Sequence, residues 1–263
     1  MHALIAAALL AATPGAAKTQ VTWYGHATFK VVTPKGTVVV VDPWFSNPKA
    51  VDKDALAKIG KVDFVLVSHG HFDHTSDAVA LGKAGAKLVS SFELGSALVA
   101  AGFPQDGASM MTLGNAGGTL PLTDELSVTL VPAVHSSGFS LPNAPPGSPA
   151  AYAGSPVGFV IQVKGGPTIY HTGDTDAFYD MKDRVGDRFK VDVMLACIGG
   201  HFTMDPEGAA LAATYVKPKT IVPMHFGTFP ILTGTPAELE KALKKHHAKA
   251  KVLEMKVGET QTF

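Results

Sequence analysis

Short apolar runs alternate with turns and alanine-rich windows along this chain of 263 residues, and that alternation constrains the fold most strongly. Several runs are almost continuously apolar, which is typical of strands covered on both faces. No linker or charge step divides the chain, so the pattern predicts one α/β domain in which helices cover the sheets. We predict strands at residues 37–41, 62–67, 87–89, 128–131, 157–163, 168–170, 191–198 and 220–224.

Three of the windows between these runs carry readable helix ends. Ser91 precedes the window 92–101 and Gly102 follows it, while Asp205 and a proline open the window 207–216. A capping box beginning at Thr235 opens the window 238–247. Capping residues before an apolar window and glycine after it are signals of helix ends, so we predict helices over these three windows.

Residues 138–156 break the alternation. This segment holds five prolines, three glycines and three serines. Such a composition supports neither a helix nor a central strand, so we predict a long surface loop. Long loops are frequently functional, and this one follows His135, a candidate ligand, so we expect it to serve the site.

The first residues read as a targeting segment. The apolar run 4–12 is less than half of the ~20 residues that span a membrane, so no transmembrane segment is expected. It has the length of the apolar region of a secretory signal, and small residues precede Lys18. We therefore expect residues 1–17 to be a signal peptide, residues 18–263 to form the domain, and the protein to be periplasmic or secreted. The alternative is a frayed N-terminal helix on a cytoplasmic protein.

Charge and cysteine content exclude several classes. Lys plus Arg and Asp plus Glu total 22 each, so the chain has no basic field to hold nucleic acid, and we expect no such partner. The single cysteine, Cys197, rules out an intramolecular disulfide and a multi-thiolate zinc site. Histidine, by contrast, occurs eleven times.

The strongest local signal follows the predicted strand 62–67. His69, His71, Asp73 and His74 place four possible metal ligands within six residues, and Gly70 allows a sharp turn between the first two. Neutral imidazoles suit zinc, and a carboxylate compensates its charge. A polar loop without metal is the plain alternative, but this density of ligands makes it rare.

Three further candidates each follow another apolar run. They are His135, Asp174, which comes after a predicted hairpin of 158–163 with 168–170, and His225. Loops at one edge of an α/β sheet commonly assemble sites. Each residue alone would be read as a core or surface side chain, whereas the joint pattern indicates a metal site.

These residues resemble the metallo-β-lactamase superfamily. Further segments resemble one subgroup of it, the small metal-dependent hydrolases akin to L-ascorbate-6-phosphate lactonase and N-acylphosphatidylethanolamine phospholipase D. The similarity extends from about Val21 to the C-terminus. The segments are Trp23-Tyr24-Gly25-His26-Ala27-Thr28-Phe29, Val41-Asp42-Pro43-Trp44, His135-Ser136-Ser137, Gly173-Asp174-Thr175, Gly199-Gly200-His201-Phe202-Thr203-Met204 and Pro223-Met224-His225-Phe226-Gly227.

The resemblance implies a four-layer αββα sandwich in a single domain and a centre of two divalent metal ions. Zinc is the first expectation, with manganese or iron as alternatives. His69, His71 and His135 would hold one ion, Asp73, His74 and His225 the other, and Asp174 would bridge them. Asp42 would orient the histidine block without binding metal. His26 would lie near the ions and contact the substrate or the tetrahedral intermediate.

The expected activity is hydrolysis. Two metals can lower the pKa of a shared water toward 7, giving a hydroxide nucleophile, while Asp73 and Asp174 hydrogen-bond it and His26 stabilises charge on the attacked oxygen. The substrate would be an ester, lactone or phosphodiester of a small molecule or lipid. A nuclease of the same fold and a metal-binding protein without turnover remain as alternatives. The sequence does not identify the substrate or decide between a monomer and a homo-oligomer.

The remaining histidines and sulfur residues carry weaker expectations. His171 is expected to be a core residue or to support the ligands, and His246 and His247 to form a solvated helix end. His201 stands where relatives often carry Asn, so its role stays open. Met110, Met111 and Cys197 are expected in the core.

Overall fold

The computed structural model describes residues 18–145 and 147–263. The expected signal peptide, residues 1–17, lies outside the described residues. Within the described part of the chain, every helix is too short or too polar to cross a membrane.

The first half of the chain forms a seven-stranded sheet with the order β16-β1-β2-β3-β4-β5-β6. The pairs β1/β2 and β2/β3 are antiparallel, whereas the pairs β3/β4, β4/β5 and β5/β6 are parallel. The C-terminal strand β16 returns to pair with β1 and so closes the domain. The strands are β1 (Gln20–Trp23), β2 (Phe29–Val32), β3 (Val38–Val41), β4 (Phe64–Leu66), β5 (Lys87–Ser91), β6 (Leu113–Gly114) and β16 (Thr260–Thr262).

The second half forms another seven-stranded sheet with the order β15-β14-β13-β12-β11-β8-β7. Strands β12 to β15 are parallel, whereas β11 pairs antiparallel with both β12 and β8. The strands are β7 (Thr119–Pro121), β8 (Leu126–Pro132), β11 (Val157–Val163), β12 (Thr168–His171), β13 (Val193–Cys197), β14 (Thr220–Met224) and β15 (Lys251–Val252).

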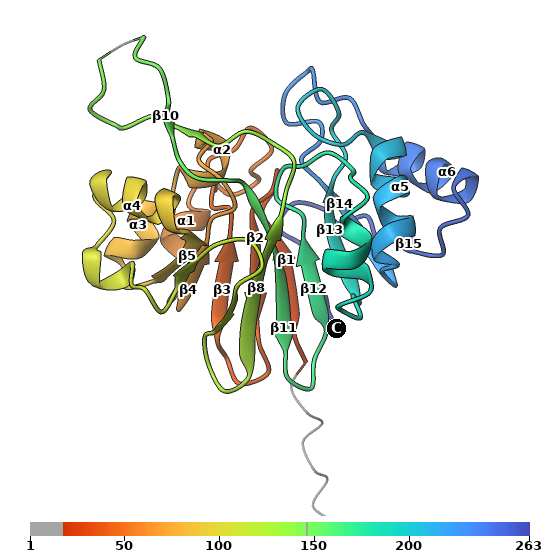
Figure 1. The fold of residues 1–263 in the computed structure, drawn as a ribbon, viewed down its shortest axis with the longest axis horizontal. Helices are drawn as coiled ribbons and strands as arrows, with labels where there is room; N and C mark the ends of the chain where they lie inside the picture. The colour runs from red at the N-terminus through yellow and green to blue at the C-terminus, as the bar shows by residue number, and fades with distance from the viewer. Residues whose placement is uncertain (1–17, 146) are drawn as a thin grey trace, which may run out of the picture.

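Helices cover the outer faces of the two stacked sheets, with α1, α3 and α4 on one side and α5 and α6 on the other (Figure 1). This is the expected four-layer αββα sandwich. The helices are α1 (Ala55–Lys58), α2 (Phe72–Thr75), α3 (Ala78–Lys83), α4 (Phe92–Ala100), α5 (Pro206–Val216) and α6 (Pro236–Lys245), with a 3₁₀ turn at Gln105–Gly107 and a π turn at Lys182–Gly186.

The main core lies between the sheets. Val39 and Leu66 of the first sheet join Phe159, Tyr170 and Met194 of the second in one buried apolar cluster. A second cluster packs the helices α1, α3 and α4 against the outer face of the first sheet. The near-continuous apolar strands are thus covered on both faces, as their sequence predicted.

All eight predicted strands and all three predicted helices are present, so the fold prediction is confirmed. The capping box of Thr235 with Glu238 opens α6, and the Asp205 side chain accepts a hydrogen bond from Gly208 N at 2.8 Å. Ser91 precedes α4 without capping it through its side chain.

Two sequence predictions need correction. Met110 and Met111 were expected in the core, but they are 78% and 75% exposed, because they lie in a turn after the 3₁₀ segment that faces outward. The loop 138–156 is mostly exposed, as predicted, but it also contains a short antiparallel pair, β9 (Gly138–Phe139) with β10 (Ala151–Tyr152). This pair projects above one end of the sandwich (Figure 1).

Candidate metal centre

The block after β4 is held in place by the base of the long loop. Gly70 N donates a hydrogen bond to Ser137 Oγ at 3.1 Å, and Ser137 Oγ donates to Ala153 O at 3.1 Å. A Cβ at Gly70 would lie only 2.9 Å from Gly138 O, so a larger residue would displace the loop. Gly70 therefore permits the close seating of the long loop over the site, while its φ lies outside the left-handed region, so the turn itself does not require glycine.

Three imidazoles form the first group. His71 Nδ1 lies 3.0 Å from His69 Nε2 and 3.3 Å from His135 Nε2. Ligand nitrogens of a tetrahedral zinc site, with bonds of ~2.0–2.1 Å, stand roughly 3.3 Å apart. The spacing of these three nitrogens therefore suits one shared ion.

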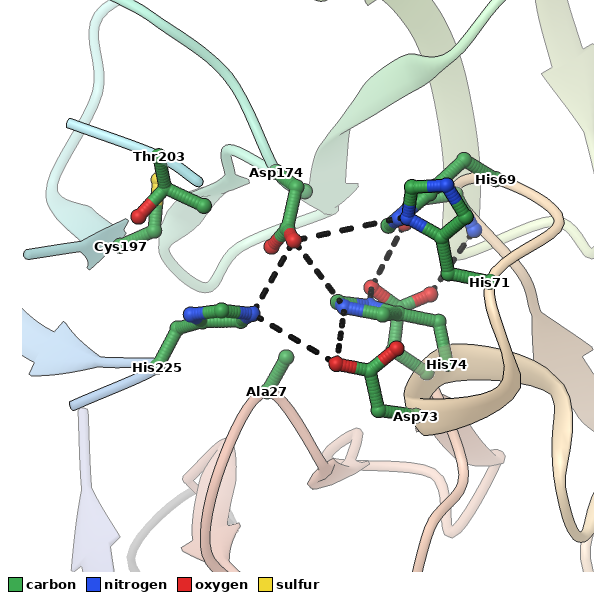
Figure 2. A network of polar contacts seen from close by, with 12 residues as sticks. Ala27, His69, His71, Asp73, His74, Asp174, Cys197, Thr203 and His225 are labelled. Carbon is green, nitrogen blue, oxygen red and sulfur yellow. Dashed lines mark hydrogen bonds and ion pairs between the residues drawn. The ribbon is translucent and has the colours of Figure 1, made fainter. Parts of the chain in front are cut away.

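A second group surrounds Asp73, and Asp174 lies between the two groups (Figure 2). Asp73 Oδ2 lies 3.8 Å from His225 Nε2 and 3.9 Å from His74 Nε2. Asp174 Oδ2 lies 3.0 Å from His225 Nε2 and 3.4 Å from His74 Nε2.

Asp174 also reaches the first group. Its Oδ2 lies 3.7 Å from His135 Nε2 and 3.9 Å from His69 Nε2. The structure thus brings all seven candidate ligands together from four loops, and it places Asp174 where one carboxylate touches both groups.

Several buried polar atoms of the two groups have the character of metal ligands. Among the residues that the structure describes, none forms a hydrogen bond of acceptable geometry with the buried atoms Asp174 Oδ1, His74 Nε2 and His225 Nε2. Buried polar atoms are normally paired, and leaving one unpaired costs about 1–3 kcal/mol. A concentration of such atoms among imidazoles and carboxylates fits metal ligation.

Burial keeps the imidazoles of the first group in the form that binds metal. It lowers the pKa of His69, His71 and His135 below the ordinary value for histidine. These rings are therefore neutral near pH 7 and offer a lone pair to a cation.

The second group concentrates negative charge. Burial alone would lower the pKa of His74, but the carboxylates of Asp174, Asp42 and Asp73 outweigh it and raise that pKa well above its usual range. Burial would raise the pKa of Asp174, but His225 and His74 outweigh it, so the carboxyl stays ionised. A divalent cation bound among these carboxylates would balance their negative charge, as a protonated His74 does.

Asp42 orients the histidines from behind. Its carboxylate accepts hydrogen bonds from Ser68 N at 2.8 Å, Ser68 Oγ at 2.7 Å and His74 Nδ1 at 2.8 Å. Since Ser68 Oγ donates its hydrogen to Asp42, it accepts from His69 Nδ1, which lies at 3.0 Å. Nε2 of both His69 and His74 is thereby left to face the site. Metal-binding histidines in proteins are commonly held in this way, with the other ring nitrogen donating to a hydrogen-bond acceptor.

His171 supports the turn that carries Asp174. Its ring is fully buried, Nε2 donates to Ala27 O at 3.0 Å, and Nδ1 accepts from Gly173 N at 3.1 Å. Both ring nitrogens are occupied, so His171 is a supporting core residue.

His26 lies behind Asp73 and not in the cavity. Its ring is fully buried, with Nε2 3.0 Å from Asp73 Oδ2 and Nδ1 2.9 Å from Thr228 Oγ1. Burial lowers the pKa of His26 to about 4, so a neutral ring donates from Nε2 to the carboxylate and accepts from Thr228. The expectation of direct contact with substrate does not fit this geometry, because the ring is fully buried, is not part of the cavity lining and contacts Asp73.

Three of these residues adopt left-handed backbone conformations. The φ angles are 49° at His26, 46° at Asp42 and 56° at His225. Residues other than glycine rarely adopt such angles, and they persist where the surroundings demand them, often at functional sites.

A cavity of about 710 Å³ opens over the two groups. His71, Asp73, His135, Asp174 and His225 form its floor, and apolar side chains form most of its walls. This volume lies within the usual range for small-molecule sites, ≈ 300–1,000 Å³.

The other histidines lie elsewhere. His201 is exposed and does not line the cavity, although its neighbour Phe202 does. His246 was expected to be merely solvated, but its Nε2 lies 2.8 Å from Glu207 Oε2. Cys197 is buried, as predicted.

Sequence reasoning gave no role to Ser68 or Thr228, although both directly contact groups of the site. Each is next to or near a candidate ligand, Ser68 beside His69 and Thr228 three residues after His225. Hydroxyl residues flanking a ligand were the only available signal.

Comparison with known proteins agrees with this geometry. Residues 20–225 match the Beta-lactamase superfamily domain. A UPF0173 metal-dependent hydrolase of Anaeromyxobacter sp. (strain K) is 60% identical over 248 residues, 94% of this chain and 87% of that protein. Another, from Thermodesulfovibrio yellowstonii, is 47% identical over 246 residues, 92% of this chain and 91% of that protein.

Solved structures give the same result. Igni18, a metallo hydrolase from the hyperthermophilic archaeon Ignicoccus hospitalis, superposes with a TM-score of 0.78 at 34% identity, covering 94% of this chain and 98% of that one. The matched domain, the close relatives and the shared fold agree: the chain belongs to the β-lactamase superfamily and, within it, to the UPF0173 family of metal-dependent hydrolases.

Proposed function

We propose that the chain is a binuclear metal-dependent hydrolase that cleaves an ester, lactone or phosphodiester bond of a small molecule or lipid. The observation that carries the proposal is the position of Asp174, whose Oδ2 lies within 3.9 Å of histidines in both groups. A carboxylate between two sets of ligands suits two ions better than one. His69, His71 and His135 would hold the first ion, and Asp73, His74 and His225 the second.

The chemistry divides between the ions and the protein. When bound, two divalent ions supply Lewis acidity and lower the pKa of a water toward 7. Asp73 lines the cavity with 13% of its side chain exposed, so its carboxylate can accept a hydrogen bond from a water and orient it. His26 and Asp42 hold Asp73 and His74 from behind, and the apolar walls restrict access of bulk water.

The proposal predicts two metal equivalents per chain. Seven ligands exceed what one tetrahedral ion uses, so protein saturated with zinc or manganese and then desalted should retain two ions by elemental analysis. Zinc is the expected ion, with manganese or iron tested alongside it.

Activity on a panel of esters, lactones and phosphodiesters, lost on chelation and restored by metal, tests the hydrolase assignment. Retention of at most one equivalent would contradict the binuclear centre. Two bound ions with no turnover on the whole panel would instead favour a metal-binding protein.

Replacing His26 should affect turnover more than metal content. In His26→Ala the N–H that holds Asp73 is lost, and we expect activity to fall roughly 10–100-fold, as for other groups that support metal ligands. Both ions should remain, because seven other ligands are intact. Elemental analysis, melting temperature and turnover measured together check this expectation.

Two controls sharpen the His26 experiment. His26→Asn tolerates the left-handed backbone and separates loss of the ring from backbone strain. His201→Ala also changes a left-handed histidine, but one outside the cavity, and should keep normal turnover. Loss of one metal equivalent in His26→Ala would make His26 a ligand of the second ion.

We also propose that residues 1–17 direct export to the periplasm or beyond. The support is the short apolar run 4–12 followed by small residues before Lys18. The mature protein should begin near Lys18 and occur in the exported fraction, as judged by N-terminal sequencing and intact mass. Protein that retains Met1 in the cytosolic fraction would refute this.

A further inference from the structure

The walls of the cavity over the metal centre are apolar and aromatic. Phe139 and Leu232 are buried, and Phe229 closes the wall next to them. Phe72 and Phe202 stand at the opening, 62% and 57% exposed. Large exposed apolar side chains beside a cavity are typical of a surface that an apolar ligand covers.

Part of this wall is a preformed aromatic stack. The ring of Trp44 packs edge-on against Phe72 at 5.5 Å between centroids and stacks on Phe229 at 5.9 Å. Aromatic pairs in these arrangements add ~0.5–1.5 kcal/mol beyond the burial of their area. The wall is therefore fixed before a ligand arrives, which reduces the entropy lost on binding.

The described lining of the cavity contains no positively charged Lys or Arg side chain. The ionisable side chains of this described lining are all candidate metal ligands. The chain carries no charged residue from 136 to 163, which includes the loop over the cavity. Phosphate groups are usually held by Arg or Lys in addition to any metal.

We propose that the substrate is an uncharged carboxylic ester or lactone whose apolar group packs among Phe72, Phe202 and Phe229. This inference rests on the proposed hydrolase function and narrows it from three bond types to carbonyl esters. Water adds to the carbonyl carbon, the acyl C–O bond breaks, and a proton from the water passes to the leaving oxygen. An ester thus yields one carboxylic acid and one alcohol, and a lactone yields one hydroxy acid.

The first test is a chain-length series on the zinc-loaded enzyme. With p-nitrophenyl acetate, butyrate and octanoate, kcat/KM should rise at least about 10-fold from acetate to octanoate, because each buried CH₂ adds favourable transfer free energy. Bis(p-nitrophenyl) phosphate should be hydrolysed more slowly than octanoate. Turnover without dependence on chain length, or a preference for the phosphodiester, would overturn the substrate class and leave the hydrolase assignment standing.

A matched pair of variants locates the effect. Phe202→Ser should raise KM for the octanoate about 10-fold and so reduce the preference for octanoate over acetate, because Phe202 is part of the apolar wall. Tyr179→Ser removes an aromatic ring of similar exposure, 64%, from outside the cavity lining and should leave the chain-length dependence unchanged. Equal behaviour of the two variants would refute the assigned wall.

A binding measurement separates this inference from the function on which it rests. Calorimetry should show that 2-decanone, an uncharged analogue that cannot be hydrolysed, binds at least about 10-fold tighter than 2-butanone or dibutyl phosphate. The preference should disappear in Phe202→Ser. If 2-decanone binds preferentially but the protein hydrolyses no ester, lactone or phosphodiester, the hydrolase proposal is overturned and the apolar site stands. If 2-decanone, 2-butanone and dibutyl phosphate bind with equal affinity, the apolar site is overturned.

Discussion

Asp174→Ala should bind less metal than the unchanged protein, and its turnover should fall about 10⁴-fold or more. Asp174 Oδ2 is the one carboxylate atom within 4 Å of histidines from both ligand groups, by the ion-pair distances of the described residues. Its loss removes one of the carboxylates that face His74 and His225, and it removes the proposed link between the two ions. Elemental analysis of the purified variant and turnover at saturating metal measure the two effects.

Asp176→Ala is the matched control for this variant. Asp176 lies two residues away on the same turn and is exposed, and its side chain accepts a hydrogen bond from the neighbouring Ala177 N. It should keep two ions and normal turnover. If Asp174→Ala retained two ions and lost activity alone, Asp174 would be a proton acceptor rather than a bridging ligand.

Most of the strands that the sequence predicted are buried on both faces. β14 and β11 were predicted with their observed bounds, because unbroken apolar runs have few other ways to be buried. β2 alternates buried and half-buried residues over only four positions, and β16 is mostly polar and pairs with β1 from the other end of the chain. Such strands are stabilised by their partners, so they left no local signal.

The candidate ligands could be predicted for a similar physical reason. His69, Asp174 and His225 follow β4, β12 and β14, and the ends of these strands meet at one end of the sandwich (Figure 1). Topology therefore brings the ligands together once the strands are known.

The supporting contacts could not be predicted in this way. The place of His26 depends on a left-handed backbone and on Thr228, which lies 202 positions away in the chain. The aromatic wall joins Trp44, Phe72 and Phe229 from three separate segments. These arrangements follow from tertiary packing, which no local spacing records.

Asp42→Ala should lower the stability of the fold as well as disturb the metal centre. The carboxylate is fully buried and accepts three hydrogen bonds from Ser68 and His74, so its removal leaves three buried donors without their acceptor. Breaking such a network costs about 3–5 kcal/mol. For a domain of this size, a loss of that order lowers the melting temperature by about 10 °C, which calorimetry or thermal shift can measure.

Asp42→Asn separates the packing role of Asp42 from its role in orienting His74. Asparagine fits the cavity and tolerates the φ of 46°, but its amide has one acceptor oxygen in place of two. At least one donor of Ser68 or His74 must then face the NH₂ group. We expect this variant to recover most of the melting temperature and to keep a 10–100-fold deficit in metal affinity or turnover, because His74 is no longer held with Nε2 toward the site. Full recovery of both properties in Asp42→Asn would show that Asp42 only fills space, and that the orientation of His74 comes from elsewhere in the block.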